Sequence, residues 1–399
     1  MSDDGRRRQL FAIGFLGFVA LGTPVAALGV AWAQMQRSFG VSLESLGLVM
    51  VALLLGRVLV SVYSGNLASR MGVGNYLLAG SLLMLTGFAG VATAPGLLPL
   101  IILHTTLGVG VTVLNTGINI HAAAHYSGGR MNLLHTGFGL GSALGPLIVT
   151  LVVFQLGLNW RWSYVVFFVP QLGLTLLLAR TRQSWKLNGK PASGESAQPL
   201  RHSLRLAPVW FGMLLFFLHG GIQHGTGALG NSLMIDGRGI APDQAGLWVS
   251  IFWAGLTIGR VLTGVLVERI GNNRFMRFSM LLTIVGTLLF QANLGESPTF
   301  AGIALIGLTL APVLPLLLAD TPGRVGAAHS PNTVGLQIGS SGVGMAILPA
   351  LMAVVAERVG LETIGVGLLL IALLSFLVHE GLLALERRLA LPASLSPAR

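Results

Sequence analysis

The sequence predicts an all-α integral membrane protein with twelve transmembrane helices in two pseudo-symmetric six-helix bundles. Three observations support this fold class: a high apolar content, twelve long apolar runs, and a motif that occurs in both halves. Of 399 residues, 53% are hydrophobic and 9% are charged, which does not fit a water-soluble surface. The chain has no cysteine, so disulfides and thiolate metal sites are excluded.

The apolar runs fit helices that cross a bilayer. A hydrocarbon core about 30 Å thick needs about 20 apolar residues of helix, and lipid offers no hydrogen bonds to the backbone. The runs also lack the alternation of a membrane barrel. The predicted spans are residues 10–32, 45–67, 76–93, 97–125, 133–156, 162–179, 206–233, 244–267, 278–292, 300–319, 334–356 and 364–385.

The positive charge follows the rule that cytoplasmic loops are basic. The chain has 24 Lys and Arg against 13 Asp and Glu. If both termini are cytoplasmic, the outer loops hold only Arg37, Arg161, Arg238 and Arg358. Arg57 and Arg260 fall inside spans, and the other basic residues lie in inner loops or tails. The charge therefore predicts a multi-pass topology in a bacterial plasma (inner) membrane, and no nucleic-acid partner.

A short motif occurs once in each half of the chain. The residues Gly-Arg-Val-Leu begin at Gly56 and again at Gly259, each time in an even-numbered span. Such duplication is typical of transporters built from two related bundles. We expect a monomer with an N-terminal bundle over residues 1–179, a polar cytoplasmic linker over 180–205 and a C-terminal bundle over 206–399.

A glycine-rich basic turn follows each copy of the motif. The turns read Gly65-Asn-Leu-Ala-Ser-Arg70-Met-Gly72 and Gly264-Val-Leu-Val-Glu268-Arg269-Ile-Gly271. With the twelve spans and the long central loop, these turns resemble the major facilitator superfamily. The resemblance implies a solute transporter whose cytoplasmic closure is controlled by the turn residues Gly65, Arg70, Gly72, Gly264, Glu268, Arg269 and Gly271.

A second resemblance is to the fucose-permease-like sugar-symporter branch of that superfamily. Residues 135–146 carry it, together with Asn115, Asn119 and residues 311–315. Two positions depart from the family patterns. Ser69 stands where the superfamily usually has an aspartate, and Gln223 stands where the sugar-symporter branch carries a glutamate. The second departure argues against proton coupling through a carboxylate.

Arg57 and Arg260 are the main candidates for binding a solute. Counting 1.5 Å per residue from the basic turns places both near mid-depth in their spans. An arginine at a helix centre costs about 2.5–3.5 kcal/mol to insert, so we expect neither to face lipid. Each either binds an anion in a cavity between the halves or bridges neighbouring helices. Trp253, seven residues before Arg260 and on the same helix face, is predicted as its partner in binding the solute.

The acidic residues all fall in loops or near span ends. No carboxylate is therefore placed to neutralise the two arginines, which predicts an anionic solute. The candidates to orient it are Asn115 and Asn119 in span four, and His219 and Gln223 in span seven. Each of these could instead have a structural role. Histidine titrates near neutral pH, so His219 and His224 are the candidates for coupling to a proton.

Small residues and prolines predict where helices pack closely or bend. Gly137, Gly141 and Gly145 recur every fourth residue, which predicts the interface between the two halves. Pro312 and the pair Gly220-Gly221 predict bends near mid-depth. No nucleophile-base pair or metal-ligand set has diagnostic spacing, so we expect no enzymatic activity, metal or cofactor.

The sequence thus predicts a secondary active transporter that moves a small polar, anionic solute by alternating access in a lipid bilayer. An organic acid or a sugar derivative fits, with a proton as the candidate co-transported ion. Two alternatives remain open: a multidrug or metabolite exporter working as an antiporter, and a non-transporting membrane receptor. A wide aromatic cavity would favour the exporter, and a site that never changes sides would favour the receptor.

Overall fold

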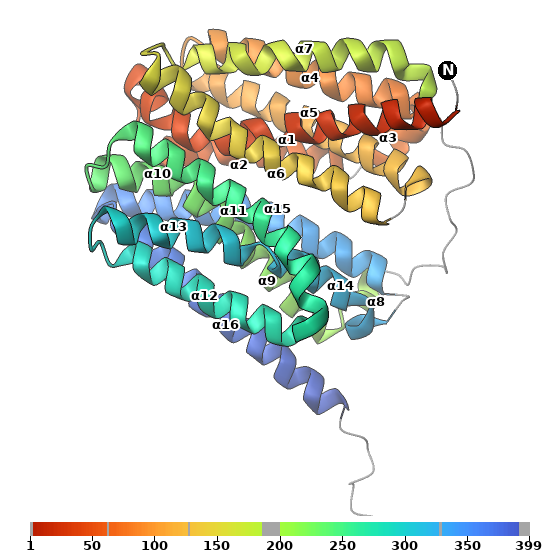
Figure 1. The fold of residues 1–399 in the computed structure, drawn as a ribbon, viewed down its shortest axis with the longest axis vertical. Helices are drawn as coiled ribbons and strands as arrows, with labels where there is room; N and C mark the ends of the chain where they lie inside the picture. Colours follow the sequence, from red (N-terminus) through yellow and green to blue (C-terminus); the bar gives the residue numbers. More distant parts are fainter. Residues whose placement is uncertain (1–2, 62–63, 127, 186–199, 327–328, 391–399) are drawn as a thin grey trace, which may run out of the picture.

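The structure is a computed structural model that describes residues 3–61, 64–126, 128–185, 200–326 and 329–390. The described residues form helices and no strand (Figure 1). Nine helices within these ranges are long and apolar enough to cross a membrane. Many large apolar side chains are exposed along them, including Leu59, Leu98 and Leu377. The prediction of an all-helical membrane protein is confirmed at this level.

The N-terminal half, residues 3–185, forms one group of helices (Figure 1). Its elements are α1 Asp3–Phe39, α2 Glu44–Ser61, α3 Ser64–Met71, α4 Val73–Thr93, α5 Leu97–His125, α6 Gly128–Thr150, the π-helical turn η1 Leu151–Gln155, α7 Arg161–Thr181 and the short η2 Arg182–Ser184.

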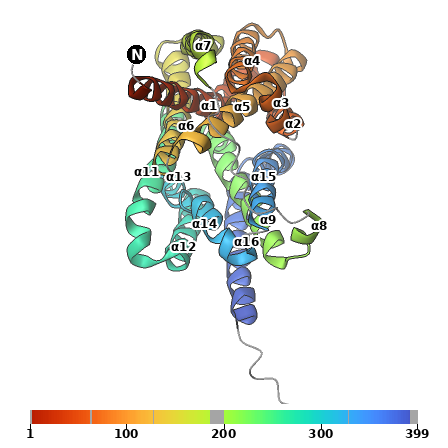
Figure 2. The same cartoon turned by 90° about the vertical axis from the view of Figure 1, so that its right-hand side faces the viewer.

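The C-terminal half, residues 200–390, forms the second group beside the first (Figures 1 and 2). Its elements are α8 Leu200–Ser203, α9 Ala207–His224, η3 Gly225–Leu229, α10 Gly230–Ser232, η4 Leu233–Gly237, α11 Pro242–Ile270, α12 Asn272–Gln291, α13 Glu296–Leu310, α14 Val313–Val325, α15 Ser330–Val359 and α16 Thr363–Ala390. Each of the predicted ranges contains helix.

The predicted bends are observed at one site and displaced at the other. The range 300–319 divides into α13 and α14 at Ala311-Pro312, because proline has no N–H to continue the helical ladder. Helix α9 instead runs regularly through Gly220-Gly221 and becomes π-helical only at Gly225. Gly220 is needed for packing, since a side chain there would meet the Ser341 carbonyl of α15.

The repeated motif has the same structural role in both halves. Gly56 of α2 packs on the Thr105 carbonyl of α5, and Gly259 of α11 packs on the Leu308 carbonyl of α13. The turns correspond as well: Gly72 has φ +77° and Gly271 has φ +84°, in the region that only glycine enters freely. The backbone therefore explains the glycines of the repeat without reference to a ligand.

The two halves meet most closely at one end of the molecule. We call the end where α1 begins and α16 finishes the inner end, and the opposite end, where α1 finishes and α16 begins, the outer end. At the outer end the Arg37 Nη2 lies 3.4 Å from Asp236 Oδ1, and Leu43 N donates to Glu357 Oε2 at 3.0 Å. Gln155 Nε2 donates to Asp243 Oδ2 at 3.0 Å. We call these three contacts the outer seal.

The prediction for the glycines of span five was wrong in part. Gly141 and Gly145 pack on the Val19 and Thr23 carbonyls of α1, inside the N-terminal half. Gly139 of the same helix does meet the other half, at Thr257 of α11, and Thr150 meets Gly246 of α11. A helical stripe of small residues predicts a close contact, but its partner depends on how the helix is rotated in the bundle.

Candidate functional site

Arg57 lies between the two halves. Its side chain is half-buried and lines a cavity of about 30 Å³, large enough for one water molecule. The walls come from both halves: α1, α2, α9 and α15. The lining residues are Val25, Leu28, Met50, Leu53, Leu54, Arg57, His224, Gly342, Met345 and Ala346. Arg57 has no hydrogen-bond or ion-pair partner among the described residues.

His224 connects this cavity to α11. The imidazole lines the cavity with Arg57, and its ring packs edge-on against the Trp253 indole at 5.7 Å between centroids. Trp253 also packs on Phe252. Trp253 was predicted as a partner of Arg260, but among the described residues no cation–π contact joins these two. Its ring turns toward α9 because Gly227 leaves room for the indole there.

Arg260 occupies the corresponding position of the second repeat. It is half-buried on α11, one turn after Thr257. Thr257 meets Gly139 of α6, so this part of α11 packs on the N-terminal half. Arg260, like Arg57, has no hydrogen-bond or ion-pair partner in the described part of the chain.

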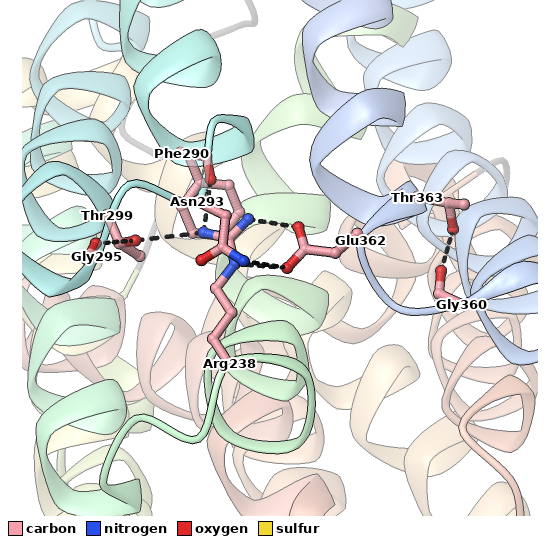
Figure 3. A network of polar contacts seen from close by, with 8 residues as sticks. All are labelled: Arg238, Phe290, Asn293, Gly295, Thr299, Gly360, Glu362 and Thr363. Atoms are coloured by element: carbon pink, nitrogen blue, oxygen red, sulfur yellow. Dashed lines mark hydrogen bonds and ion pairs between the residues drawn. The ribbon is translucent and has the colours of Figure 1, made fainter.

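Three arginines of the C-terminal half have carboxylate partners. Arg238, whose side chain is 2% exposed, binds Glu362 through two bonds of 2.9 and 2.7 Å and donates to the Phe290 carbonyl (Figure 3). Arg277 binds Glu380 through two bonds of 2.6 Å. Arg324 binds Asp320 and Glu386. The two arginines of the repeated motif have no carboxylate of this kind among the described residues.

The amides predicted to orient a solute lie in two different settings. Asn119 Nδ2 donates to the Asn115 carbonyl at 2.9 Å and to Asn115 Oδ1 at 3.0 Å, so this half-buried pair is bonded to itself along α5. Gln223 is 3% exposed and its Oε1 has no partner among the described residues. His219 is 2% exposed, and its Nδ1 is also unpartnered there.

The family model of the Major Facilitator Superfamily matches residues 10–233 and 226–397. Together these matches cover most of the sequence. The chain belongs to the Major Facilitator Superfamily. It is therefore a multi-pass membrane protein and a secondary transporter of small solutes, and the superfamily predicted from the sequence is confirmed.

The chain has low sequence identity to individual members of the superfamily. The glucose/mannose transporter GlcP of Bacillus subtilis is 26% identical over 55% of this chain, and the match spans 56% of the length of GlcP. The probable sulfoacetate transporter SauU of Cupriavidus necator is 24% identical over 84% of this chain and 83% of its own length. The crystal structure of the nucleoside transporter NupG superposes with a TM-score of 0.72 at 15% identity, covering 96% of this chain and 99% of that chain.

In this superfamily member the two motif turns lie at the inner end. Arg70 and Arg269 are exposed in the last turns of α3 and α11, where a cation is favoured by the helix dipole. Gly72 and Gly271 form the left-handed turns described above. The surroundings of Gly65, Gly264 and Glu268 lie outside the part of the chain that the structure describes.

Sequence reasoning identified Trp253 but missed the other members of a set of buried polar side chains on the outer side of the arginines. Trp32 of α1 and Trp253 of α11 are 0% and 2% exposed, and neither indole Nε1 has a partner among the described residues. The same holds for side-chain oxygens of Thr226, Asn231 and Ser232. An unsatisfied buried polar group costs about 1–3 kcal/mol. Asn231, an amide within an apolar run, was the one visible signal in the sequence.

Proposed function

We propose that this transporter moves a small organic anion by alternating access, with Arg57 and Arg260 as its anion-binding groups. The observation that carries the proposal is the contrast among arginines. Arg238, Arg277 and Arg324 have carboxylate partners, whereas Arg57 and Arg260 have none among the described residues. A guanidinium inside a membrane protein needs a counter-charge or water, and a transported anion supplies the charge.

The position of the two arginines supports the same role. Arg57 lines a cavity with walls from both halves, and Arg260 lies one turn from Thr257, which meets Gly139 of the N-terminal half. A ligand held there contacts both groups of helices, which is the requirement for alternating access. Asn115, Asn119, His219, Gln223 and Trp253 are proposed to orient it. The probable sulfoacetate transporter SauU, which is named for an anion, is a relative over most of the chain.

We propose the following topology for this function. The chain crosses the bacterial plasma membrane twelve times, with both termini cytoplasmic and the inner end facing the cytoplasm. Residues 1–179 and 206–399 form the two six-helix bundles, residues 180–205 link them, and the chain acts as a monomer. The Arg70 and Glu268-Arg269 turns control closure at the inner end. Because the outer seal is formed, the structure corresponds to the state closed toward the outside.

His219 and His224 are proposed to couple transport to a proton. His224 shares the cavity of Arg57, and His219 is buried in the same helix, α9, five residues earlier. A proton on His224 would be repelled by the free guanidinium nearby, and a bound anion removes that repulsion. Anion and proton would then bind together and cross as a symport.

The test is uptake into proteoliposomes containing the purified full-length protein. We expect uptake of sulfoacetate or gluconate, stimulated by an inwardly directed proton gradient, and none of glucose. Arg57→Gln and Arg260→Gln should each reduce anion uptake at least tenfold. Arg180→Gln, which removes an exposed arginine at the end of α7, should leave uptake unchanged. Glucose uptake that is insensitive to both interior substitutions would overturn the proposal.

A further inference from the structure

The polar set on the outer side of the arginines is built on one irregular segment, residues 225–237. Two π-helical stretches, η3 and η4, flank the short α10 in this segment. Such π-helical stretches occur frequently at functional sites. Thr226, Asn231 and Ser232 are buried in it, at 0%, 0% and 1% exposure. Thr226 Oγ1, Asn231 Oδ1 and Ser232 Oγ have no hydrogen-bond partner among the described residues.

Two indoles flank this segment, one from each half of the molecule. Gly29 of α1 approaches the backbone of Ala228 closely, and its carbonyl accepts a 3.4 Å bond from Asn231 Nδ2. Trp32 lies one turn further along α1, and its indole Nε1 has no partner among the described residues. Trp253 of α11, which belongs to the same half as the segment, packs against Gly227.

Several buried hydroxyls elsewhere in the bundle are bonded to other side chains. Ser81 and Thr175 hydroxyls are 2.7 Å apart, and those of Thr283 and Thr309 are 2.9 Å apart. Unpartnered hydroxyls also occur elsewhere among the described residues, at Thr150, Ser163, Tyr164 and Ser341. The set around residues 225–237 differs in its composition, because two N–H donors, two hydroxyl oxygens and an amide oxygen lack partners on three segments that pack against one another. A polar ligand would satisfy all five groups.

The chemistry of this set selects its ligand. Two N–H donors, two hydroxyls and an amide oxygen are all neutral, and their common complement is a hydroxyl group, which both donates and accepts. Through Trp253 and His224 the set adjoins the cavity of Arg57. We propose that Trp32, Thr226, Asn231, Ser232 and Trp253 bind substrate hydroxyls, so that the solute is a hydroxylated organic anion of the sugar-acid type. This inference rests on the proposed function, in which Arg57 and Arg260 bind the anionic group of the solute.

The experiment measures the affinity of the purified full-length protein for three probes: gluconate, hexanoate and glucose. Gluconate and hexanoate share a six-carbon chain and a carboxylate, but only gluconate carries hydroxyls. We expect gluconate to bind at least tenfold more tightly than hexanoate. Trp32→Phe and Trp253→Phe keep an aromatic ring but remove the N–H, so each should weaken gluconate about tenfold and leave hexanoate unchanged. Trp162→Phe, at a 54% exposed side chain, is the matched control.

The outcomes separate this inference from the proposed function. If gluconate and hexanoate bind equally, and both are weakened by Arg57→Gln, the anion transporter stands and hydroxyl recognition is overturned. If the indole substitutions weaken both acids by the same factor, the indoles support the fold and the inference is also overturned. If glucose alone binds, and Arg57→Gln has no effect on its affinity, the proposed transport of an anion bound by the two arginines is wrong.

Discussion

At the scale of single residues, the chain treats arginine in two distinct ways. Arg238 is almost fully buried and satisfied by Glu362, the Phe290 carbonyl and the Thr299 hydroxyl (Figure 3). It ties the segment after η4 to the ends of α12 and α16. Arg57 and Arg260 are half-buried within α2 and α11, and neither has such a partner in the described chain. A paired arginine stabilises the fold, whereas an unpaired one is available to a ligand.

Arg238 provides the prediction at this scale. Arg238→Gln leaves Glu362 without its cation and removes two further hydrogen bonds, so we expect a loss of about 3 kcal/mol in stability. Thermal unfolding of the purified protein in detergent measures it. Affinity for a transported anion should stay unchanged. Arg37→Gln is the control, because both members of that pair are exposed and its loss should cost less than about 1 kcal/mol.

At the scale of helices, close backbone contacts explain the glycine of the repeated motif. In each half, the glycine before the arginine lets one helix lie directly on a carbonyl of its neighbour, Thr105 or Leu308. The contact fixes the rotation of α2 and of α11. It thereby determines where the next side chain, Arg57 or Arg260, is directed. The motif thus couples a packing residue to a functional residue.

Alanine substitutions test this packing role. A methyl group at Gly56 would overlap the Thr105 carbonyl, so Gly56→Ala should destabilise the protein by about 1–3 kcal/mol. Gly339 lies inside helix α15 with open space around its Cα. Gly339→Ala should therefore be neutral or stabilise by about 0.5–1 kcal/mol. Equal unfolding temperatures for the two variants would contradict the packing explanation.

At the scale of the whole molecule, the outer seal holds the two halves together through carboxylates of the C-terminal half. Asp236, Asp243 and Glu357 each accept a contact from the N-terminal half. The outer ends of the halves therefore separate only when these contacts break. Because the chain has no cysteine, a single introduced thiol reports which side the interior faces.

Val25 lines the cavity of Arg57 and lies inward of the seal. We expect the Val25→Cys thiol to react slowly with an impermeant maleimide added from outside. Adding Asp236→Ala, Asp243→Ala and Glu357→Ala should increase that rate about tenfold, since weakening the closed state by about 1.4 kcal/mol shifts the equilibrium by that factor. Glu44→Ala, at an exposed acid of the same end, serves as control. A rate that the triple substitution leaves unchanged would show that these contacts do not hold the halves closed.

Much of the fold was predictable because a bilayer imposes simple rules on sequence. The apolar runs located helix in every expected range, and the Gly56 and Gly259 repeat indicated the duplicated packing. Of the proposed site, the sequence most clearly indicated the two charged residues. Arg57 and Arg260 are conspicuous because charge is costly in hydrocarbon. Trp32 and Thr226 are not, since both residue types are ordinary in a membrane helix.

The sequence by itself determined the helical class, the superfamily and the two unneutralised arginines, because apolar length, motif spacing and charge are properties of the chain alone. Only the tertiary structure decided which helix faces meet. It placed His224 beside Arg57, packed Trp253 against His224, and brought α1, residues 225–237 and α11, with their buried polar groups, against one another. The physical reason is that hydrogen-bond satisfaction depends on neighbours from distant segments, and helix rotation within the bundle sets those neighbours.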